Sequence, residues 1–183
     1  MAKQQTIPEQ ASGENIALLV IDVQRGLFNR GAPIYQSERL LKNIHHLVHQ
    51  AHLADAPVVY VQHSADRQLV QGSHDWLLHP RLNPQPEDLH VDKRHGSAFE
   101  ATPLGEELKT RQVGTVVVCG LVTHGCVKAT SLDALRLGYR VILAADAHSN
   151  YSKDAARQIE QWNAKLQAAG AVVIPASEIE FGG

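Results

Sequence analysis

Residues 16–23 have the sequence IALLVIDV, an apolar run interrupted only by Asp22 near its end. Unbroken apolar runs are typical of strands in parallel sheets, because helices cover both faces of such a strand. Further short segments that read as strands occur at 58–61, 89–91, 115–119, 141–144 and 171–174, and most of them are apolar. Most of the segments between these runs carry apolar residues at helical spacing, so strands and helices are expected to alternate.

This alternation predicts an α/β fold of three layers, with a doubly wound, six-stranded parallel sheet in the order 3-2-1-4-5-6. Helices are expected from Ser37 to before Pro57, near 102–111, from Cys126 to Gly138 and from Ser152 to Gly170. In doubly wound sheets ligands bind beyond the carboxyl ends of the strands, so the functional site is expected at that edge.

Length and composition limit the function classes. The 183 residues fit one domain, and we expect a loose tail over 1–15 and a single domain over 16–183. The net charge of −2 lacks the basic excess that nucleic acid binding requires. Two cysteines are too few for a secreted disulfide framework, so a cytoplasmic location is expected. No segment has the apolar character of a signal peptide or the length of a membrane span, so no membrane partner is expected.

Three reactive side chains follow the carboxyl ends of predicted strands, namely Asp22, Lys93 and Cys126. In the predicted order, strands one and four are neighbours at the switch point, which places Asp22 beside Cys126. Lys93 follows strand three, which lies two strands, or about 10 Å, from strand one. Its side chain must therefore lean back over the sheet to reach Asp22. At a helix N-terminus, the Cys126 thiolate is expected to be stabilised as a nucleophile with a lowered pKa.

Each of these residues also has a purely structural interpretation. Cys126 could pack a helix against the sheet, Asp22 could cap a turn, and Lys93 could be solvated within the charged run 92–94. Cys119, inside an apolar strand, is interpreted as a core residue.

Metal and cofactor motifs are not found. Of the eleven histidines, His45, His49 and His52 share one helix face that could bind a transition metal, but a solvated face is the favoured interpretation because the apolar residues occupy the other side. Five more histidines lie in or near the long loops, namely His63, His74, His79, His90 and His95. No H-E-x-x-H, C-x-x-C or G-x-G-x-x-G motif is present, so no metal and no dinucleotide cofactor are predicted.

Three separated segments resemble the isochorismatase-like cysteine hydrolases, which include nicotinamidases and the carbamoylsarcosine and biuret amidohydrolases. These segments are ALLVIDVQ (17–24), DKRHGSAFEATPL (92–104) and VVVCGLVTHGCVKATSLDALRLGY (116–139). VVYVQH (58–63) and VILAADA (141–147) extend the resemblance over about 16–175. The most specific motif, G-x-x-T-x-x-C-V, falls on Gly120, Thr123, Cys126 and Val127.

The resemblance implies a catalytic triad of Asp22, Lys93 and Cys126, and acyl transfer through a thioester without a metal or organic cofactor. It also implies a non-proline cis peptide between Leu121 and Val122, with the backbone N–H groups of Val122 and Cys126 forming an oxyanion hole. Homo-oligomers, dimers or tetramers, are expected. Nicotinamidases of the family bind a metal through Asp-x-His after the second strand, where this chain has Gln62-His63, so that metal is not expected here.

The expected activity is hydrolysis of a C–N bond in a small amide or ureide, in a pocket under the 64–87 loop. Phe28, Trp76, Thr123 and His124 are the expected substrate contacts, and Tyr35 could also line the pocket. Two alternatives stay open, namely the vinyl ether hydrolysis of a true isochorismatase and a catalytically silent member that serves as a binding module.

Overall fold

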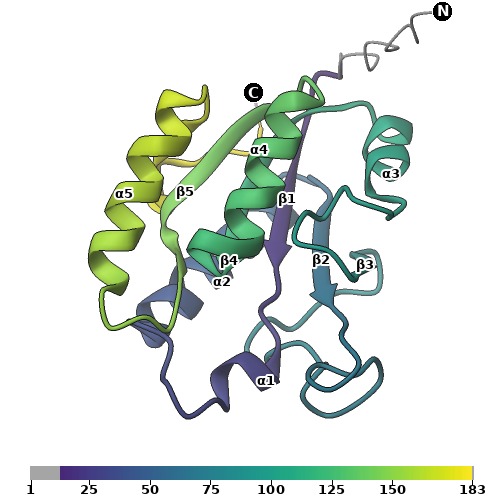
Figure 1. Ribbon diagram of the computed structural model, residues 1–183. Coiled ribbons are helices and arrows are strands. Elements are labelled where there is room, and N and C mark those ends of the chain that lie inside the picture. The colour runs from purple at the N-terminus through teal and green to yellow at the C-terminus, as the bar shows by residue number, and fades with distance from the viewer. Residues whose placement is uncertain (1–12, 183) are drawn as a thin grey trace, which may run out of the picture.

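A six-stranded parallel sheet in the order β3-β2-β1-β4-β5-β6 forms the centre of the computed structural model, which describes residues 13–182 (Figure 1). This order confirms the predicted sheet. Its strands are β1 (Asn15–Ile21), β2 (Val58–His63), β3 (Leu89–Lys93), β4 (Val113–Leu121), β5 (Arg140–Ser149) and β6 (Val172–Ile174). β1 begins one residue before the predicted domain boundary, and residues 1–12 of the predicted tail lie outside the described residues.

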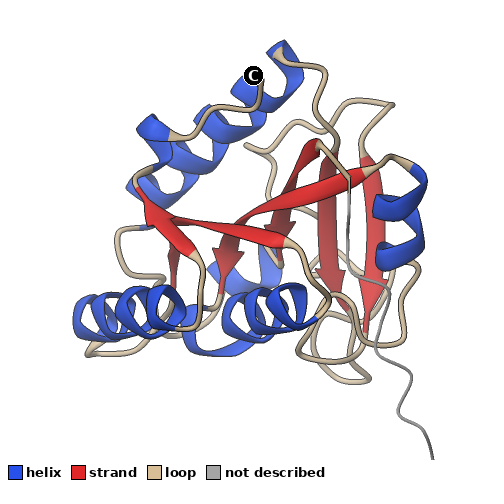
Figure 2. Ribbon diagram, turned by 90° about the horizontal axis from the view of Figure 1, so that it is seen from above, coloured by secondary structure: helices blue, strands red, loops and turns tan. Residues whose placement is uncertain are grey.

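Helices cover both faces of this sheet (Figure 2). One face packs against α2 (Ser37–Leu53) and the short η2 (Ala176–Glu178), and the other against α3 (Leu104–Thr110), α4 (Lys128–Arg136) and α5 (Ala155–Ala168). The short α1 (Arg25–Phe28) follows β1.

The apolar run of β1 is explained by these two layers. Leu18 and Val20 belong to the core under α2, whereas Leu19 and Ile21 belong to the core on the opposite face. All four are fully buried. Because successive strand residues point to opposite faces, a central strand buried on both sides needs apolar residues at every position.

The helix expected from Cys126 begins differently. A π-helical turn, η1 (Thr123–Val127), precedes α4, and Gly125 within it has non-helical angles of φ −113° and ψ −109°. Cys126 therefore lies in an irregular turn ahead of α4. The other end is as predicted, since Gly138 follows α4 with a φ of 87°.

Gly120 allows β4 to pass close to β1 just before this turn. Its φ is +114°, and a Cβ atom at this position would lie 2.1 Å from the carbonyl oxygen of Ile21. Only glycine combines that dihedral angle with that approach of two backbones.

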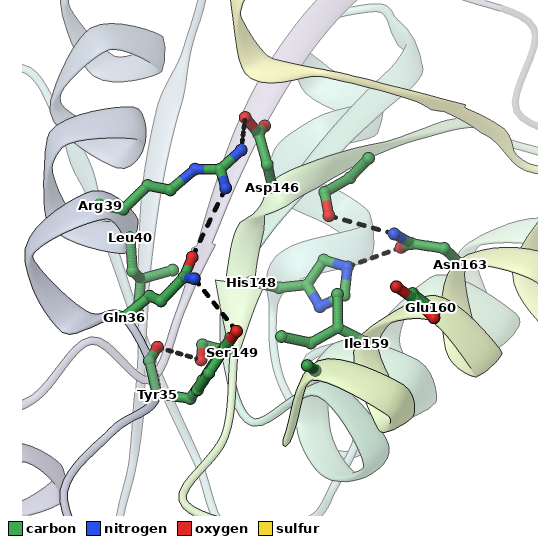
Figure 3. Close-up of a pocket in the computed structure, with 12 residues that line it drawn as sticks. Tyr35, Gln36, Arg39, Leu40, Asp146, His148, Ser149, Ile159, Glu160 and Asn163 are labelled. Atoms are coloured by element: carbon green, nitrogen blue, oxygen red, sulfur yellow. Dashed lines mark hydrogen bonds and ion pairs between the residues drawn. The ribbon is translucent and has the colours of Figure 1, made fainter. Parts of the chain in front are cut away.

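A buried hydrogen-bonded chain supports η1 from the side of β5 and α5. Asn163 Nδ2 donates to the carbonyl oxygen of Ala145 (3.1 Å), so its Oδ1 accepts from His148 Nε2 at 2.8 Å (Figure 3). His148 Nδ1 then lacks a proton and accepts from the Thr123 hydroxyl at 2.9 Å. The chain holds the first residue of η1 to α5, and it requires a neutral His148.

His148 and Asn163 also line a pocket of about 260 Å³ between α2, β5 and α5, together with Tyr35 (Figure 3). Tyr35 was expected near the 64–87 loop, but it lies at this pocket instead. Its backbone N–H donates to the carbonyl oxygen of Asn150, which follows β5.

We predict that Gly120→Ala lowers the free energy of unfolding by about 3 kcal/mol or more, because the new Cβ clashes with backbone and the positive φ is strained. Urea unfolding followed by circular dichroism measures the loss. Gly105→Ala in α3 is the matched control, since a Cβ there meets no atom within 4 Å. It should be neutral or stabilising by up to about 1 kcal/mol. Equal stability of the two variants would contradict the prediction.

A second prediction concerns acid stability. Burial lowers the pKa of His148 to about 4, from an ordinary value near 6.5. Between these values the unfolded chain binds a proton that the folded chain does not, so stability falls as the pH is lowered from 6.5 to 4, by about 3 kcal/mol. His148→Gln should remove that part of the pH dependence, measured by urea unfolding across this interval.

The matched control is His46→Gln, on the exposed side of α2. It should keep the wild-type pH dependence. Parallel curves for wild type and His148→Gln would show that His148 does not titrate as its burial requires.

Candidate active site

The Lys93 ammonium lies at the centre of a cluster that contains the expected reactive residues. Lys93 Nζ donates to Asp22 Oδ2 at 3.0 Å, to the carbonyl oxygen of His95 at 3.1 Å and to Cys126 Sγ at 3.2 Å. His63 Nδ1 lies 3.2 Å from the same nitrogen, so four acceptors share the three N–H groups of the ammonium. The side chain of Lys93 is 0% exposed and that of Asp22 3%. The structure thus brings Asp22, Lys93 and Cys126 together.

Each residue reaches the cluster from the carboxyl edge of the sheet. Asp22 follows β1 with a φ of 51°, and its backbone N–H donates to the carbonyl oxygen of Val61. Lys93 is the last residue of β3, and its side chain leans back across β2 toward β1 as expected. Cys126 follows β4, the other neighbour of β1.

Burial controls the protonation of this cluster. It raises the pKa of Cys126 to about 12, and the nearby Asp22 carboxylate contributes in the same direction. Burial also raises the pKa of Asp22, although the Lys93 ammonium opposes that shift. The expectation of a lowered thiol pKa at a helix N-terminus was therefore wrong. Cys126 lies in η1 rather than in α4, and desolvation dominates there.

The Asp22 carboxylate has one oxygen available for a proton. Oδ2 accepts from Lys93, whereas Oδ1 is buried and has no hydrogen-bond partner among the described residues. A carboxylate oxygen of Asp22 and Cys126 Sγ lie within 4.8 Å of each other. A neutral thiol and a buried carboxylate of raised pKa are suited to proton transfer at neutral pH.

His63 is a member of the cluster that the sequence marked only as one of several histidines near the loops. Burial lowers its pKa, and the Lys93 ammonium contributes, so its neutral ring accepts at Nδ1. The buried Gln24 fixes its backbone: Gln24 Oε1 accepts from His63 N at 2.8 Å and Nε2 donates to His63 O at 3.0 Å. Its position in the sequence could have indicated this role, because His63 ends the apolar run of β2, the strand next to β1.

Three side chains of the cluster are of types that bind metals. Within residues 13–182, the one group of three or more such residues with ligand atoms close together consists of Asp22, His63 and Cys126, within 4.8 Å of one another. On α2, His45 and His49 are exposed, and His52 Nε2 instead pairs with Asp88 at 2.8 Å.

The turn between β4 and η1 has the expected backbone geometry. The peptide bond between Leu121 and Val122 is cis. The carbonyl oxygen of Val122 accepts from the N–H groups of Gly125 (2.9 Å) and Val127 (3.3 Å), which folds the turn back on itself. The oxyanion hole expected from the N–H groups of Val122 and Cys126 stays a prediction.

The expected substrate contacts divide into two groups. Thr123 is fully buried and bonded to His148, and Phe28 packs its ring on His79 at 4.5 Å. Trp76 donates to Ser64 Oγ at 2.8 Å. These three side chains have partners within the protein, whereas His124 is half-buried and its buried Nδ1 has no hydrogen-bond partner among the described residues. The role of all four in substrate binding stays a prediction.

Trp76 lines a separate cavity of about 540 Å³, together with His79 and His90. His90 and Lys93 are three residues apart in β3, so their side chains point to opposite faces of the sheet. The cavity under the 64–87 loop therefore lies on the face opposite Lys93, because its wall includes His90.

No helix in the described part of the chain, residues 13–182, has the length and apolar character needed to cross a membrane.

Comparison with known proteins places these features in a family. The model of the Isochorismatase domain matches residues 16–178. A streptothricin hydrolase from Streptomyces noursei is 36% identical over 142 residues, which are 76% of this chain and 56% of that protein. The chain covers 52% of a second streptothricin hydrolase, so it spans about half the length of these relatives.

Two other similar proteins match over most of their length. A maleamate amidohydrolase from Pseudomonas putida is 30% identical over 161 residues, 75% of this chain and 76% of that protein. The crystal structure of an N-carbamoylsarcosine amidase from Thermoplasma acidophilum superposes with a TM-score of 0.78 at 25% identity, and the match covers 91% of this chain and 99% of that one. Since the domain model matches nearly all of the described chain, the protein belongs to the isochorismatase family.

Proposed function

We propose that this protein is a cysteine-dependent hydrolase that cleaves a C–N bond of a small amide or ureide through a thioester. The observation that carries the proposal is the buried Lys93 ammonium, which contacts both the Asp22 carboxylate and the Cys126 sulfur. A structural lysine would need only its ion pair. Contact with a thiol as well supports the roles of base for Asp22, cation for Lys93 and nucleophile for Cys126.

In the first step, Asp22 Oδ1 takes the thiol proton as Cys126 Sγ attacks the carbonyl carbon. A neutral thiol makes this base necessary, and the raised pKa of Asp22 makes it a stronger one. The Lys93 ammonium stabilises negative charge on sulfur during the transfer. The N–H groups of Val122 and Cys126 are the proposed donors to the carbonyl oxygen as it becomes an oxyanion.

In the second step, the protonated Asp22 gives its proton to the leaving nitrogen as the C–N bond breaks. The acyl group stays on Cys126 as a thioester. Asp22 then takes a proton from water as the water oxygen attacks the thioester carbon. It returns that proton to Cys126 Sγ as the C–S bond breaks and the acid leaves, which restores the carboxylate and the thiol. One carboxyl group thus serves twice as base and twice as acid.

Recognition of the substrate is assigned to His124. Its Nδ1 is buried without a hydrogen-bond partner in the described chain, and it lies two residues before the nucleophile. Such an atom needs a partner, which a polar group of a bound substrate can supply. The relatives support an amide substrate, since two of them are named as a maleamate amidohydrolase and an N-carbamoylsarcosine amidase.

The vinyl ether alternative is less well supported. Hydrolysis of a vinyl ether has no step that requires a thiol nucleophile, and the Lys93 contact to Cys126 would then have no chemical role. A silent binding module would likewise not need the uncommitted oxygen of Asp22.

The triad is tested by ammonia release from a panel of small amides and ureides, with isochorismate turnover measured in parallel. Cys126→Ala and Asp22→Asn should each lower ammonia release by at least about 10³-fold. Cys119→Ala is the matched control, because Cys119 is buried in β4 away from the cluster, and it should retain activity.

Isochorismate turnover that survives Cys126→Ala would establish the vinyl ether activity instead. A folded wild-type protein inactive on the whole panel would favour the binding module.

The neutral thiol leads to a separate prediction. With a pKa of about 12, the thiolate fraction of Cys126 rises about tenfold per pH unit, so its alkylation by iodoacetamide should accelerate in that proportion from pH 7 to 9.5. Mass spectrometry of the Cys126 peptide measures the rate, and the fully buried Cys119 serves as an unreactive internal reference. A rate that levels off near pH 8 would show that the thiol pKa is not raised.

A further inference from the structure

The atoms around Lys93 Nζ form a set of ligands that a metal ion could use. Asp22 Oδ2, His63 Nδ1 and Cys126 Sγ lie 3.0, 3.2 and 3.2 Å from the ammonium nitrogen. The ligand atoms of these three residues lie within 4.8 Å of one another. They come from three different strand ends, β1, β2 and the turn after β4, so the fold rather than local sequence spacing assembles them.

Thiolate, imidazole and carboxylate together are the ligand types that Zn²⁺ prefers. Zinc bonds to these atoms are about 2.0–2.3 Å long, so each ligand would move inward by roughly 1 Å from its present distance to Nζ. His63 offers an unprotonated Nδ1, as its hydrogen bond from Lys93 requires.

We propose that the Lys93 ammonium occupies a latent Cys–His–Asp metal site, and that Zn²⁺ inhibits the protein by taking its place. In this exchange the metal bonds to the Cys126 sulfur, His63 Nδ1 and an Asp22 oxygen. The thiol proton passes to water, and the ammonium leaves the space between the three ligands. Metal binding is argued from geometry alone, whereas the inhibition also rests on the proposed function.

Lys93 keeps this site in its metal-free form. The side chain is 0% exposed and is held by the Asp22 carboxylate and the carbonyl oxygen of His95, so a metal must displace a buried, paired cation. That cost weakens zinc binding in the wild-type chain. Replacing Lys93 by an uncharged residue of similar length should therefore strengthen it.

The test is protection of Cys126 from alkylation, which requires no substrate. Saturating Zn²⁺ should slow iodoacetamide modification of wild-type Cys126 at least about tenfold, with full recovery on adding EDTA, since a metal-bound thiolate is not free to react. Lys93→Met should be protected at zinc concentrations at least about tenfold lower. His63→Ala should require at least about tenfold higher concentrations than wild type.

His90→Ala is the matched control, because His90 lies on the opposite face of β3, and it should behave as wild type. Protection that is unchanged in His63→Ala would show that zinc binds the thiol alone, and it would overturn the proposed site. Absence of protection in both wild type and Lys93→Met, each folded by circular dichroism, would overturn it as well.

Cobalt provides a second readout that does not depend on the alkylation chemistry. Co²⁺ added to Lys93→Met should produce the intense absorption of a cobalt–thiolate bond. In the same Lys93→Met background, adding Cys126→Ser should abolish this absorption, and adding His63→Ala should weaken it. Absence of that absorption in folded Lys93→Met would contradict the site. These measurements stay informative if no amide is hydrolysed, and ammonia release tests the proposed function independently of any metal.

Discussion

The buried ion pair between Lys93 and Asp22 constrains the whole carboxyl edge of the sheet. Removing an ammonium and a carboxylate from water costs several kcal/mol for each ion, and only close partners offset that cost. Lys93 has such partners in Asp22, the carbonyl oxygen of His95 and the Cys126 sulfur. The ends of β1, β3 and the η1 turn are therefore tied together by one cation. Loss of either charge would leave the other buried and unpaired, so the stability of this edge and the chemistry of the site depend on the same contacts.

The fold holds the turn that carries Cys126 from two sides of β4. On the β1 side, Gly120 permits the backbone of β4 to approach Ile21, which a side chain would prevent. On the β5 side, Thr123 is bonded through His148 to Asn163 on α5. These contacts orient the irregular turn that carries Cys126. Because α4 begins only after Cys126, these tertiary contacts position the sulfur.

The electrostatics of the site favour a protonated thiol with an adjacent base rather than a resting thiolate. Cys126 lies in the irregular η1 turn, not in the first turn of a regular helix. Desolvation acts on the thiol directly and raises its pKa. The same burial raises the pKa of Asp22, so one physical cause raises the pKa of both groups.

The sequence by itself determined the sheet order and the three residues at its edge. Apolar runs such as 16–21 indicate burial on both faces, and Asp22, Lys93 and Cys126 follow three of the predicted strands. Only the tertiary structure decided that His63 joins the cluster, that Thr123 bonds to His148, and that the Cys126 pKa is raised. The physical reason is the range of the interactions involved. Strand periodicity is local and visible in the chain, whereas desolvation and the choice of hydrogen-bond partners depend on atoms that are distant in sequence and adjacent only after folding.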